Sequence, residues 1–373
     1  MNKRMRLKPR QMKIGQTLSW DVYDEAGNLL LRRGHQITRE SQIDSLLERG
    51  LYADMSSHPG TSSASLLEDS DDYDPFWVWD RAKTKLAKLL HTPTLDADFS
   101  DKVKEISSLI QVLCERSPDL ALATIVLLDT KDYPVIHSMH VAVLADLAAR
   151  RIQWAESRRI SLCCAALTMN IGMIELQAQL AEQATPLTPE QRSEIDAHPA
   201  RAEAMLRAGG VSDEVWLRAV HQHHESPDGK GYPDGVSAPS EEALLLRTAD
   251  ILSAKVSPRA NRRSMPPAGA VRSLYLQEGG GASNPFSAVM IKEIGVYPPG
   301  TLVKLENGEI GVVQRRGASA NTPLVASLVT AHGEQRVAPV TRDTSKPGFA
   351  ITAVVAREEQ HVPRFSLSLI WKS

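Results

Sequence analysis

The most informative part of this sequence is residues 223–233, which read His223-His224-Glu225-Ser226-Pro227-Asp228-Gly229-Lys230-Gly231-Tyr232-Pro233. Two adjacent histidines, whose imidazoles are common metal ligands, are followed by a short loop built from glycine and proline. Gly229 and Gly231 tolerate positive φ and Pro233 fixes φ, so the loop is predicted to be a rigid turn. That turn is expected whether the histidines bind a metal or only form hydrogen bonds around a solvated cleft.

Helical periodicity extends on both sides of this stretch. Apolar residues recur at helix-compatible spacing from about residue 76 to residue 295, and Pro186, Gly209 and Gly210 punctuate the series. Helices are predicted over residues 137–151, 157–167, 189–208, 213–224, 240–254 and 267–277. The pattern predicts an all-α domain over residues 76–295.

The segment before this domain has a different character. Residues 18–24 and 29–33 read as two strands around a turn, and a helix is predicted to begin after Thr38 and to end at Gly50. Residues 1–55 therefore predict a small α+β unit. Residues 56–75 are rich in Ser and Asp and cannot build a core, so they predict a flexible linker.

The last segment, residues 296–373, changes to strand-like patterns. Strands over 301–306 and 309–314 flank Asn307-Gly308, a sequence that predicts a type I′ hairpin turn. Further strands are predicted over residues 324–330, 336–340 and 350–355. Five short strands predict a small SH3-like β-barrel, so the fold class is a multi-domain α+β protein with a central all-α domain.

Composition limits the possible functions. The chain has 373 residues with 43 Lys and Arg against 45 Asp and Glu, a formal charge of −2 that argues against a protein built to grip nucleic acid. Three cysteines without a CxxC pair argue against a disulfide framework or a zinc ribbon. The apolar run Leu120–Leu128 is far shorter than the ~20 residues of a membrane span. No signal peptide is recognised, so a cytoplasmic protein without a membrane span is expected.

The helical segment also carries the residues that could bind a metal. Imidazole and carboxylate ligands together suit Fe, Mn or Zn. The candidate metal ligands are His137, His198, His223, His224 and Asp250. Two other histidines are interpreted differently: His140 is expected to pack in the core, and His221 is expected to be solvated.

In their order and context, these residues resemble the HD-GYP domain family, a branch of the HD metal-dependent phosphohydrolases. The resemblance covers roughly residues 100–285. Members typically hydrolyse cyclic di-GMP to linear pGpG or GMP at a two- or three-metal centre. The resemblance implies that Gly231, Tyr232 and Pro233 shape the ligand cleft, in a loop linked to docking of diguanylate cyclases. Arg259 and Arg262 match an Arg-Pro-Tyr-Arg segment of the family. Their guanidinium groups could bind a phosphate by bidentate contact, and a solvated basic helix end is the alternative.

The chain departs from the family at the His-Asp pair that gives HD domains their name. Met169 and Asn170 stand in its place, Met173 replaces a lysine, and Ser253 replaces an aspartate. Two cations ~3.5–4 Å apart need anionic ligands between them, and an amide and a thioether supply none. Of the ligands that the resemblance implies, His137 and Asp250 remain for the first metal. His198, His223 and His224 remain for the second metal.

Three hypotheses follow from this departure. The first is a degenerate phosphodiesterase that acts as a regulatory binding module for cyclic di-GMP, a related nucleotide, or a protein partner such as a diguanylate cyclase. The second is a weak metal-dependent phosphodiesterase, in which Glu225 or Asp250 assists proton transfer. The third is a scaffold without a ligand. The expected cofactor is one divalent metal (Fe, Mn or Zn), or none.

Overall fold

The computed structural model describes most of the chain as two compact units, Met1–Tyr73 and Asp74–Ser373. The described residues are 4–6, 21–24, 28–32, 34–39, 52–54, 73–92, 95–127, 132–257, 265–277, 284–356 and 365–371. Each unit is treated by itself below.

The first unit contains a four-stranded antiparallel sheet. Its strands are β1 (Arg4–Arg6), β2 (Val22–Tyr23), β3 (Leu29–Leu31) and β4 (Tyr52–Asp54), in the order β1-β4-β2-β3. The predicted β2–β3 hairpin is present, and Asp24 accepts hydrogen bonds from Asn28 across its turn. The helix predicted before Gly50 and the linker at 56–72 lie outside the described residues.

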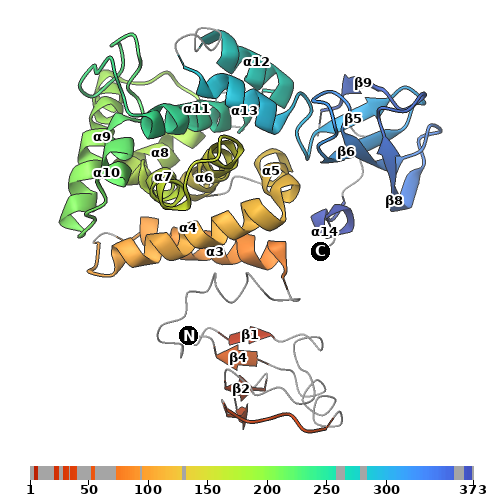
Figure 1. Cartoon of the computed structure of the whole chain (residues 1–373), viewed down its shortest axis with the longest axis horizontal. Coiled ribbons are helices and arrows are strands. Elements are labelled where there is room, and N and C mark those ends of the chain that lie inside the picture. The colour runs from red at the N-terminus through yellow and green to blue at the C-terminus, as the bar shows by residue number, and fades with distance from the viewer. Residues whose placement is uncertain are drawn as a thin grey trace. The chain divides into compact units, whose positions relative to one another are not determined.

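The second unit is mainly helical, as predicted. Helix α6 (Tyr133–Arg151) lies at its centre, between the pair α3 and α4 and the pair α11 and α13 (Figure 1). All its residues from Tyr133 to Ala149 are buried, so other parts of the unit cover α6 on every side, as expected for a core helix. The surrounding helices are α3 (Pro75–Leu90), α4 (Phe99–Arg116), α5 (Pro118–Leu127), α7 (Glu156–Thr168), α8 (Ile174–Glu182), α9 (Pro189–Ala208), α10 (Glu214–Gln222), α11 (Glu241–Val256), α12 (Pro267–Gln277) and α13 (Phe286–Ile294).

Several helix boundaries have local causes. Thr188 and Gln191 form a reciprocal capping box at the start of α9, and Pro189 occupies the first turn. Asp213 caps α10 by accepting hydrogen bonds from the backbone of Val215 and Trp216. The apolar stretch Glu156–Glu182 is long enough to cross a membrane, but 78% of its most apolar window is buried inside this unit.

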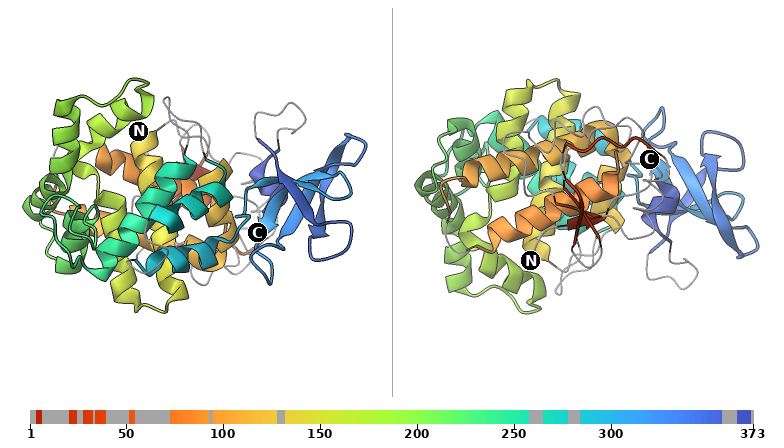
Figure 2. Two further views of the ribbon diagram at one scale, coloured as in Figure 1. Left: turned by 90° about the horizontal axis from the view of Figure 1, so that it is seen from above. Right: turned by 90° about the horizontal axis from the view of Figure 1, so that it is seen from below.

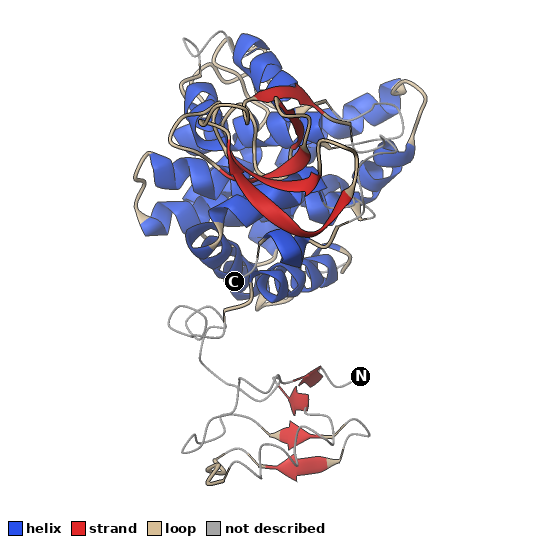
Figure 3. Ribbon diagram, turned by 90° about the vertical axis from the view of Figure 1, so that its right-hand side faces the viewer, coloured by secondary structure: helices blue, strands red, loops and turns tan. Residues whose placement is uncertain are grey.

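The C-terminal strands form an open sheet, so the predicted closed barrel is wrong. Strands β5 (Leu302–Leu305), β6 (Ile310–Arg315), β7 (Leu324–Val329), β8 (Gln335–Asp343) and β9 (Ile351–Val354) are antiparallel in the order β8-β7-β6-β5-β9. Among the described residues, β8 and β9 are edges that do not pair with each other (Figure 3). α5 and the C-terminal residues cover one apolar face of the sheet, and Tyr297, Phe349 and Ile351 pack on a second apolar cluster.

The sheet packs directly on the helices, at one end of them (Figure 2). Leu120, Ala123 and Leu127 of α5 share one apolar cluster with Val312 of the sheet and with Trp371. The indole nitrogen of Trp371, which follows α14 (Leu367–Ile370), donates to the backbone carbonyl of Gln314 at 2.8 Å. Burial of apolar surface is therefore the main attraction between sheet and helices.

An ion pair fixes the same junction. The guanidinium of Arg316, at the end of β6, donates to Asp119 of α5 at 2.7 Å and to the backbone carbonyl of Glu293 at 3.1 Å. The Arg316 side chain is 28% exposed and that of Glu293 only 9%. A partly shielded ion pair of this kind stabilises the contact between sheet and helices more than a fully exposed pair would.

The turn between β5 and β6 also differs from its prediction. A type I′ turn needs positive φ at both central residues, but φ is positive at Gly308 (88°) and not at Asn307. The Gly308 amide donates to Leu305, and Leu305 donates to Glu309 across the loop. This is the three-residue hairpin loop in which a glycine in left-handed conformation follows a type I turn.

Candidate metal centre

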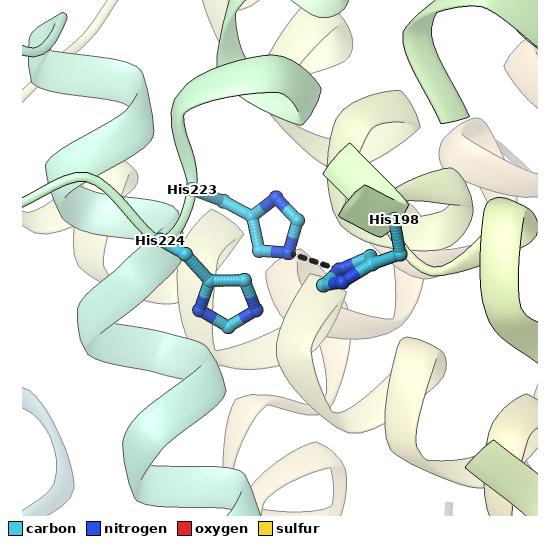
Figure 4. A group of neighbouring side chains, drawn as sticks. All are labelled: His198, His223 and His224. Carbon is cyan, nitrogen blue, oxygen red and sulfur yellow. Dashed lines mark hydrogen bonds between the residues drawn. The ribbon is translucent and has the colours of Figure 1, made fainter. Parts of the chain in front are cut away.

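Three histidines, one from the middle of α9 and two from the end of α10, meet in the second unit. His198 lies on α9 directly before Pro199, His223 is the residue at which α10 ends, and His224 follows it. One ring nitrogen from each lies within 4.8 Å of the other two (Figure 4). His198 and His223 are fully buried.

Backbone carbonyls fix the protonation of two of these rings. His198 Nδ1 lies 2.5 Å from the carbonyl oxygen of Ile195, and His223 Nδ1 lies 2.6 Å from that of Val220. A carbonyl oxygen only accepts hydrogen bonds, so both Nδ1 atoms carry the hydrogen. This assignment follows from the hydrogen-bond partners and leaves a lone pair on each Nε2.

The two Nε2 atoms face each other at 3.2 Å. Two lone pairs at this distance repel unless a proton or a cation lies between them. Burial, followed by the charge of His223, lowers the pKa of His198 to about 3, and burial likewise lowers the pKa of His223. At neutral pH no additional proton is therefore held there.

A divalent metal ion fits this arrangement. Two nitrogens bound to one tetrahedral zinc at 2.0–2.1 Å lie about 3.3 Å apart, close to the spacing of His198 and His223. Burial and the neighbouring His223 lower the pKa of His224 well below its usual value, so all three rings are neutral, the form that binds metal. The Nδ1 bonds to backbone carbonyls are the outer hydrogen bonds that orient metal-binding histidines.

The other two predicted ligands form a separate pair. His137 Nε2 on α6 lies 2.8 Å from Asp250 Oδ1 on α11. His137 Nδ1 faces Ser253 Oγ at 3.2 Å and Tyr133 Oη at 3.5 Å, and the Tyr133 ring stacks on the imidazole. Burial raises the pKa of Asp250, but the hydrogen bond and charge of His137 and the charges of the other histidines outweigh burial and lower it.

The substituted His-Asp position is buried and uncharged. Met169 is fully buried at the end of α7, and Asn170, which is 3% exposed, leaves its buried Oδ1 without a hydrogen-bond partner among the described residues. The preceding Thr168 is held in place because its hydroxyl accepts a hydrogen bond from the Trp216 indole at 2.8 Å. The position therefore offers a thioether and one amide oxygen, neither of which is anionic.

Glu225 holds the glycine-rich loop in place. Its buried carboxylate accepts hydrogen bonds from the backbone amides of Asp234 (2.7 Å), Gly235 (3.1 Å) and Val236 (2.9 Å). A charged acceptor with three donors is a strong anchor. This anchoring role was not predicted from the sequence, because the donors lie nine to eleven residues away.

The loop in turn supports the histidines. A Cβ atom on Gly231 would lie 2.4 Å from Glu225 Cα and 2.6 Å from the carbonyl oxygen of His224, so only glycine fits. The ring of Tyr232 stacks on that of His224, with centroids 4.6 Å apart. The guanidinium of Arg192, on α9, lies 5.3 Å from the centre of the Tyr232 ring, a contact that the sequence pattern did not indicate.

The remaining predicted residues fall into different environments. His221, which was expected to be solvated, has a side chain that is 21% exposed and lies 2.7 Å from both Glu203 and Asp234. His140 is fully buried and stacks on Trp79, at 5.9 Å between ring centroids. Arg259 and Arg262 lie outside the described residues.

Comparison with known proteins identifies the helical unit. Residues 121–280 match the family model of the HD domain. Residues 121–280 therefore form an HD domain, and the three-histidine cluster lies within it. Within that class the chain is similar to HD-GYP proteins, and Met169-Asn170 stand in place of the family's His-Asp pair.

Three relatives illustrate the relationship. The chain is 28% identical to cyclic di-GMP phosphodiesterase PA4108 of Pseudomonas aeruginosa, over 68% of this chain and 60% of that protein. It is 34% identical to the 3'3'-cGAMP-specific phosphodiesterase 3 of Vibrio cholerae, over 36% of this chain and 29% of that protein. The chain thus spans 60% or less of these two proteins. The structure of Bd1817, an HDG"Y"P protein from Bdellovibrio bacteriovorus, has the same fold, with a TM-score of 0.52 and 15% identity over 77% of this chain and 98% of that one.

Proposed function

We propose that this protein is a regulatory module of cyclic dinucleotide signalling, which binds cyclic di-GMP or a related nucleotide and does not turn it over efficiently. The observation that carries the proposal is the pairing of a complete three-histidine cluster with the neutral residues Met169 and Asn170. Relatives named as phosphodiesterases of cyclic di-GMP and of 3'3'-cGAMP support the ligand class.

In this proposal His198, His223 and His224 hold one divalent ion, iron, manganese or zinc. Bound there, the ion would supply a Lewis acid that attracts a phosphate oxygen. The chain's own residues do the rest: Glu225 and Gly231 fix the loop, and Tyr232 presents an aromatic ring beside the cluster. Arg259 and Arg262 are proposed to contact ligand phosphates, as bidentate guanidinium groups can.

The remaining expectations belong to the same proposal. The protein acts in the cytoplasm, and a diguanylate cyclase or another signalling protein docks on the loop at Gly231, Tyr232 and Pro233. Its domains are residues 1–55, the linker 56–75, the helical domain 76–295 and the C-terminal β domain 296–373.

A weak metal-dependent phosphodiesterase is the second candidate. It is favoured by the three histidines themselves, since three protein ligands leave a metal with an open position for water. The two candidates differ in turnover and not in binding, so one protein sample can distinguish them.

The experiment measures binding and turnover of cyclic di-GMP by the full-length protein, metal-free and loaded with Mn²⁺, Fe²⁺ or Zn²⁺. Calorimetry should detect binding, and chromatography should detect no pGpG or GMP. His223→Gln is the test variant, and His332→Gln, at an exposed turn residue, is its matched control. Turnover that His223→Gln abolishes and His332→Gln retains would establish the second candidate. If no cyclic dinucleotide binds in any metal state, the scaffold hypothesis takes the place of both.

A further inference from the structure

We propose that Arg201 and Arg247 form a phosphate-binding subsite beside the three-histidine cluster, and that this subsite binds a cyclic dinucleotide without the help of a metal ion. The inference rests on the proposed function, because it names groups that would hold the proposed ligand. It adds two arginines to Arg259 and Arg262, and it separates ligand binding from metal binding.

Arg201 places its charge at the turn that carries the substituted residues. It lies on α9 three residues after His198, so the two side chains are neighbours on the helix surface. Its guanidinium donates to the carbonyl oxygen of Gly172 at 3.1 Å. Gly172 belongs to the 3₁₀ turn Ile171–Met173, which directly follows Asn170. The guanidinium is therefore held next to the substituted segment.

Close packing fixes this position of Arg201. A Cβ atom on Gly172 would lie 2.8 Å from the carbonyl oxygen of His198 and 2.9 Å from the backbone nitrogen of Ala202. It would also lie 3.3 Å from Cβ of Arg201. Only a glycine lets the turn approach α9 this closely, so the hydrogen bond from Arg201 joins two segments that are already in contact.

The charge of Arg201 has no carboxylate beside it in the described part of the chain. Arg192 and Arg207, on the same helix, each form an ion pair with a carboxylate one turn away. Among the described residues Arg201 forms no such pair, and its hydrogen-bond partner is a neutral carbonyl. Its side chain is exposed, so a dissolved anion can reach it.

Arg247 brings a second charge to the cluster from another helix. It lies on α11 and is half-buried. Its guanidinium lies 3.5 Å from the carbonyl oxygen of His224, the histidine that follows the end of α10. Because α10 packs against both α9 and α11, the two arginines approach the same cluster from different helices.

The electrostatics of the histidines agree with these positions. Burial is the main cause that lowers the pKa of His198, and the charge of Arg201 adds to it. Burial is also the first cause for the lowered pKa of His224, where the charge of Arg247 contributes. An anion at the cluster would therefore be attracted from both α9 and α11.

The chemistry of the surrounding groups favours a phosphate ester. The nearby carboxylates have other partners, since Asp250 pairs with His137 at 2.8 Å and Glu225 accepts hydrogen bonds from three loop amides. Guanidinium groups stay charged and match phosphate oxygens with paired N–H donors. A cyclic dinucleotide offers two phosphodiester groups to such donors, and neither arginine needs a metal ion to carry its charge.

The test measures ligand binding on metal-free, full-length protein. Cyclic di-GMP is titrated by calorimetry in the presence of a chelator. Arg201→Gln and Arg247→Gln should each weaken binding about 10–100-fold, the range for hydrogen bonds to a charged group. Arg207→Gln is the matched control, because it removes the same charge from α9 at a residue already paired with Glu203 and Glu214. Its affinity should stay close to that of wild type.

Zinc affinity gives a readout that a purely structural role would not produce. Loss of a positive charge beside a cation site removes a repulsion, so both variants should bind Zn²⁺ at least as tightly as wild type. A loss of zinc affinity that parallels the loss of cyclic di-GMP affinity would show a distorted site and overturn the inference. Circular dichroism checks that each variant folds, and if Arg201→Gln does not, Arg247→Gln alone decides.

The outcomes separate this inference from the proposed function. Unchanged cyclic di-GMP affinity in a folded arginine variant would overturn the inference, as would binding that appears only after zinc is added. Both results leave the proposed function standing. Inorganic pyrophosphate is the second probe: if wild type binds it through both arginines but does not bind cyclic di-GMP, the subsite stands and the nucleotide ligand is overturned. Wild-type protein that binds neither probe, with or without zinc, overturns both.

Discussion

The Nε2 atoms of His198 and His223 lie 3.2 Å apart, while the Nδ1 atom of each ring contacts the backbone carbonyl three residues earlier. The two rings are thus held in place by α9 and α10 before any ion arrives. Such pre-organisation lowers the entropy that a ligand loses on binding. The cluster should behave as a ready site whose unfavourable lone-pair contact is relieved by a cation.

Metal binding should therefore stabilise the folded protein. An ion that binds only the native state, at a free concentration 100 times its Kd, adds about 2.7 kcal/mol to the free energy of unfolding. Thermal unfolding followed by circular dichroism, with Zn²⁺ and then with a chelator, measures the effect. His332→Gln should respond as wild type does, and His223→Gln should not respond. An equal response in both variants would place the ion elsewhere.

Restoring the missing pair should add a second ion. In the double variant Met169→His/Asn170→Asp, an imidazole and a bridging carboxylate return beside His137 and Asp250. Zinc content should rise from one ion per chain to two. Met169→Leu/Asn170→Ser, which restores no ligand, is the control. A double variant that binds no more zinc than wild type would show that residues 169 and 170 do not face the centre.

Gly231→Ala should reduce zinc affinity, although Gly231 is not itself a metal ligand. The added methyl would lie 2.4–2.6 Å from the backbone of Glu225, Ser226 and His224, so the loop must move and carry His224 with it. Displacement of one ligand should reduce zinc affinity at least tenfold and destabilise the fold by roughly 1–3 kcal/mol. Lys230→Ala, at a side chain 84% exposed, should change neither property. Unchanged zinc affinity in Gly231→Ala would contradict a supporting role for the loop.

The C-terminal sheet should contain an acid-sensitive ion pair. The buried carboxylate of Glu309 pairs with Arg336 and Arg342, both at 2.8 Å. The hydrogen bond from Arg342, which outweighs the effect of burial, lowers the pKa of Glu309 to about 2. Because this pKa lies below the ordinary value of about 4.3, the pair stabilises the fold above that pH. The contribution disappears as the pH falls toward 2.

Glu309→Gln should therefore lower the free energy of unfolding by roughly 1.5–3 kcal/mol at pH 7, the range for hydrogen bonds to charged groups. The difference from wild type should narrow between pH 4 and pH 2, about the interval between the two pKa values. Urea unfolding at pH 7, 5 and 3 measures it, with the exposed Glu334→Gln as control. A difference that stays constant down to pH 3 would show that the ionised carboxylate is not the source.

Local patterns in the sequence account for much of the fold. The predicted helices at 189–208 and 267–277 coincide with α9 and α12, because a capping box and proline mark the start of α9 and apolar periodicity continues through both. The strands after residue 300 were also predicted, since short apolar runs bounded by turn residues are a local signal. The prediction that the sheet closes into a barrel was wrong, because the helix that covers one of its faces lies about 180 residues earlier in the chain.

The sequence by itself determined which chemical groups the site can contain: the histidines, the glycine-rich loop and the neutral Met169-Asn170 pair. Only the tertiary structure decided how these groups are paired. It joined His137 to Asp250 across 113 residues, placed Ser253 beside them, and committed Glu225 to the loop. The physical reason is that periodicity, capping and turn preferences act over a few residues. Hydrogen-bond partners in a core are instead set by how whole helices pack.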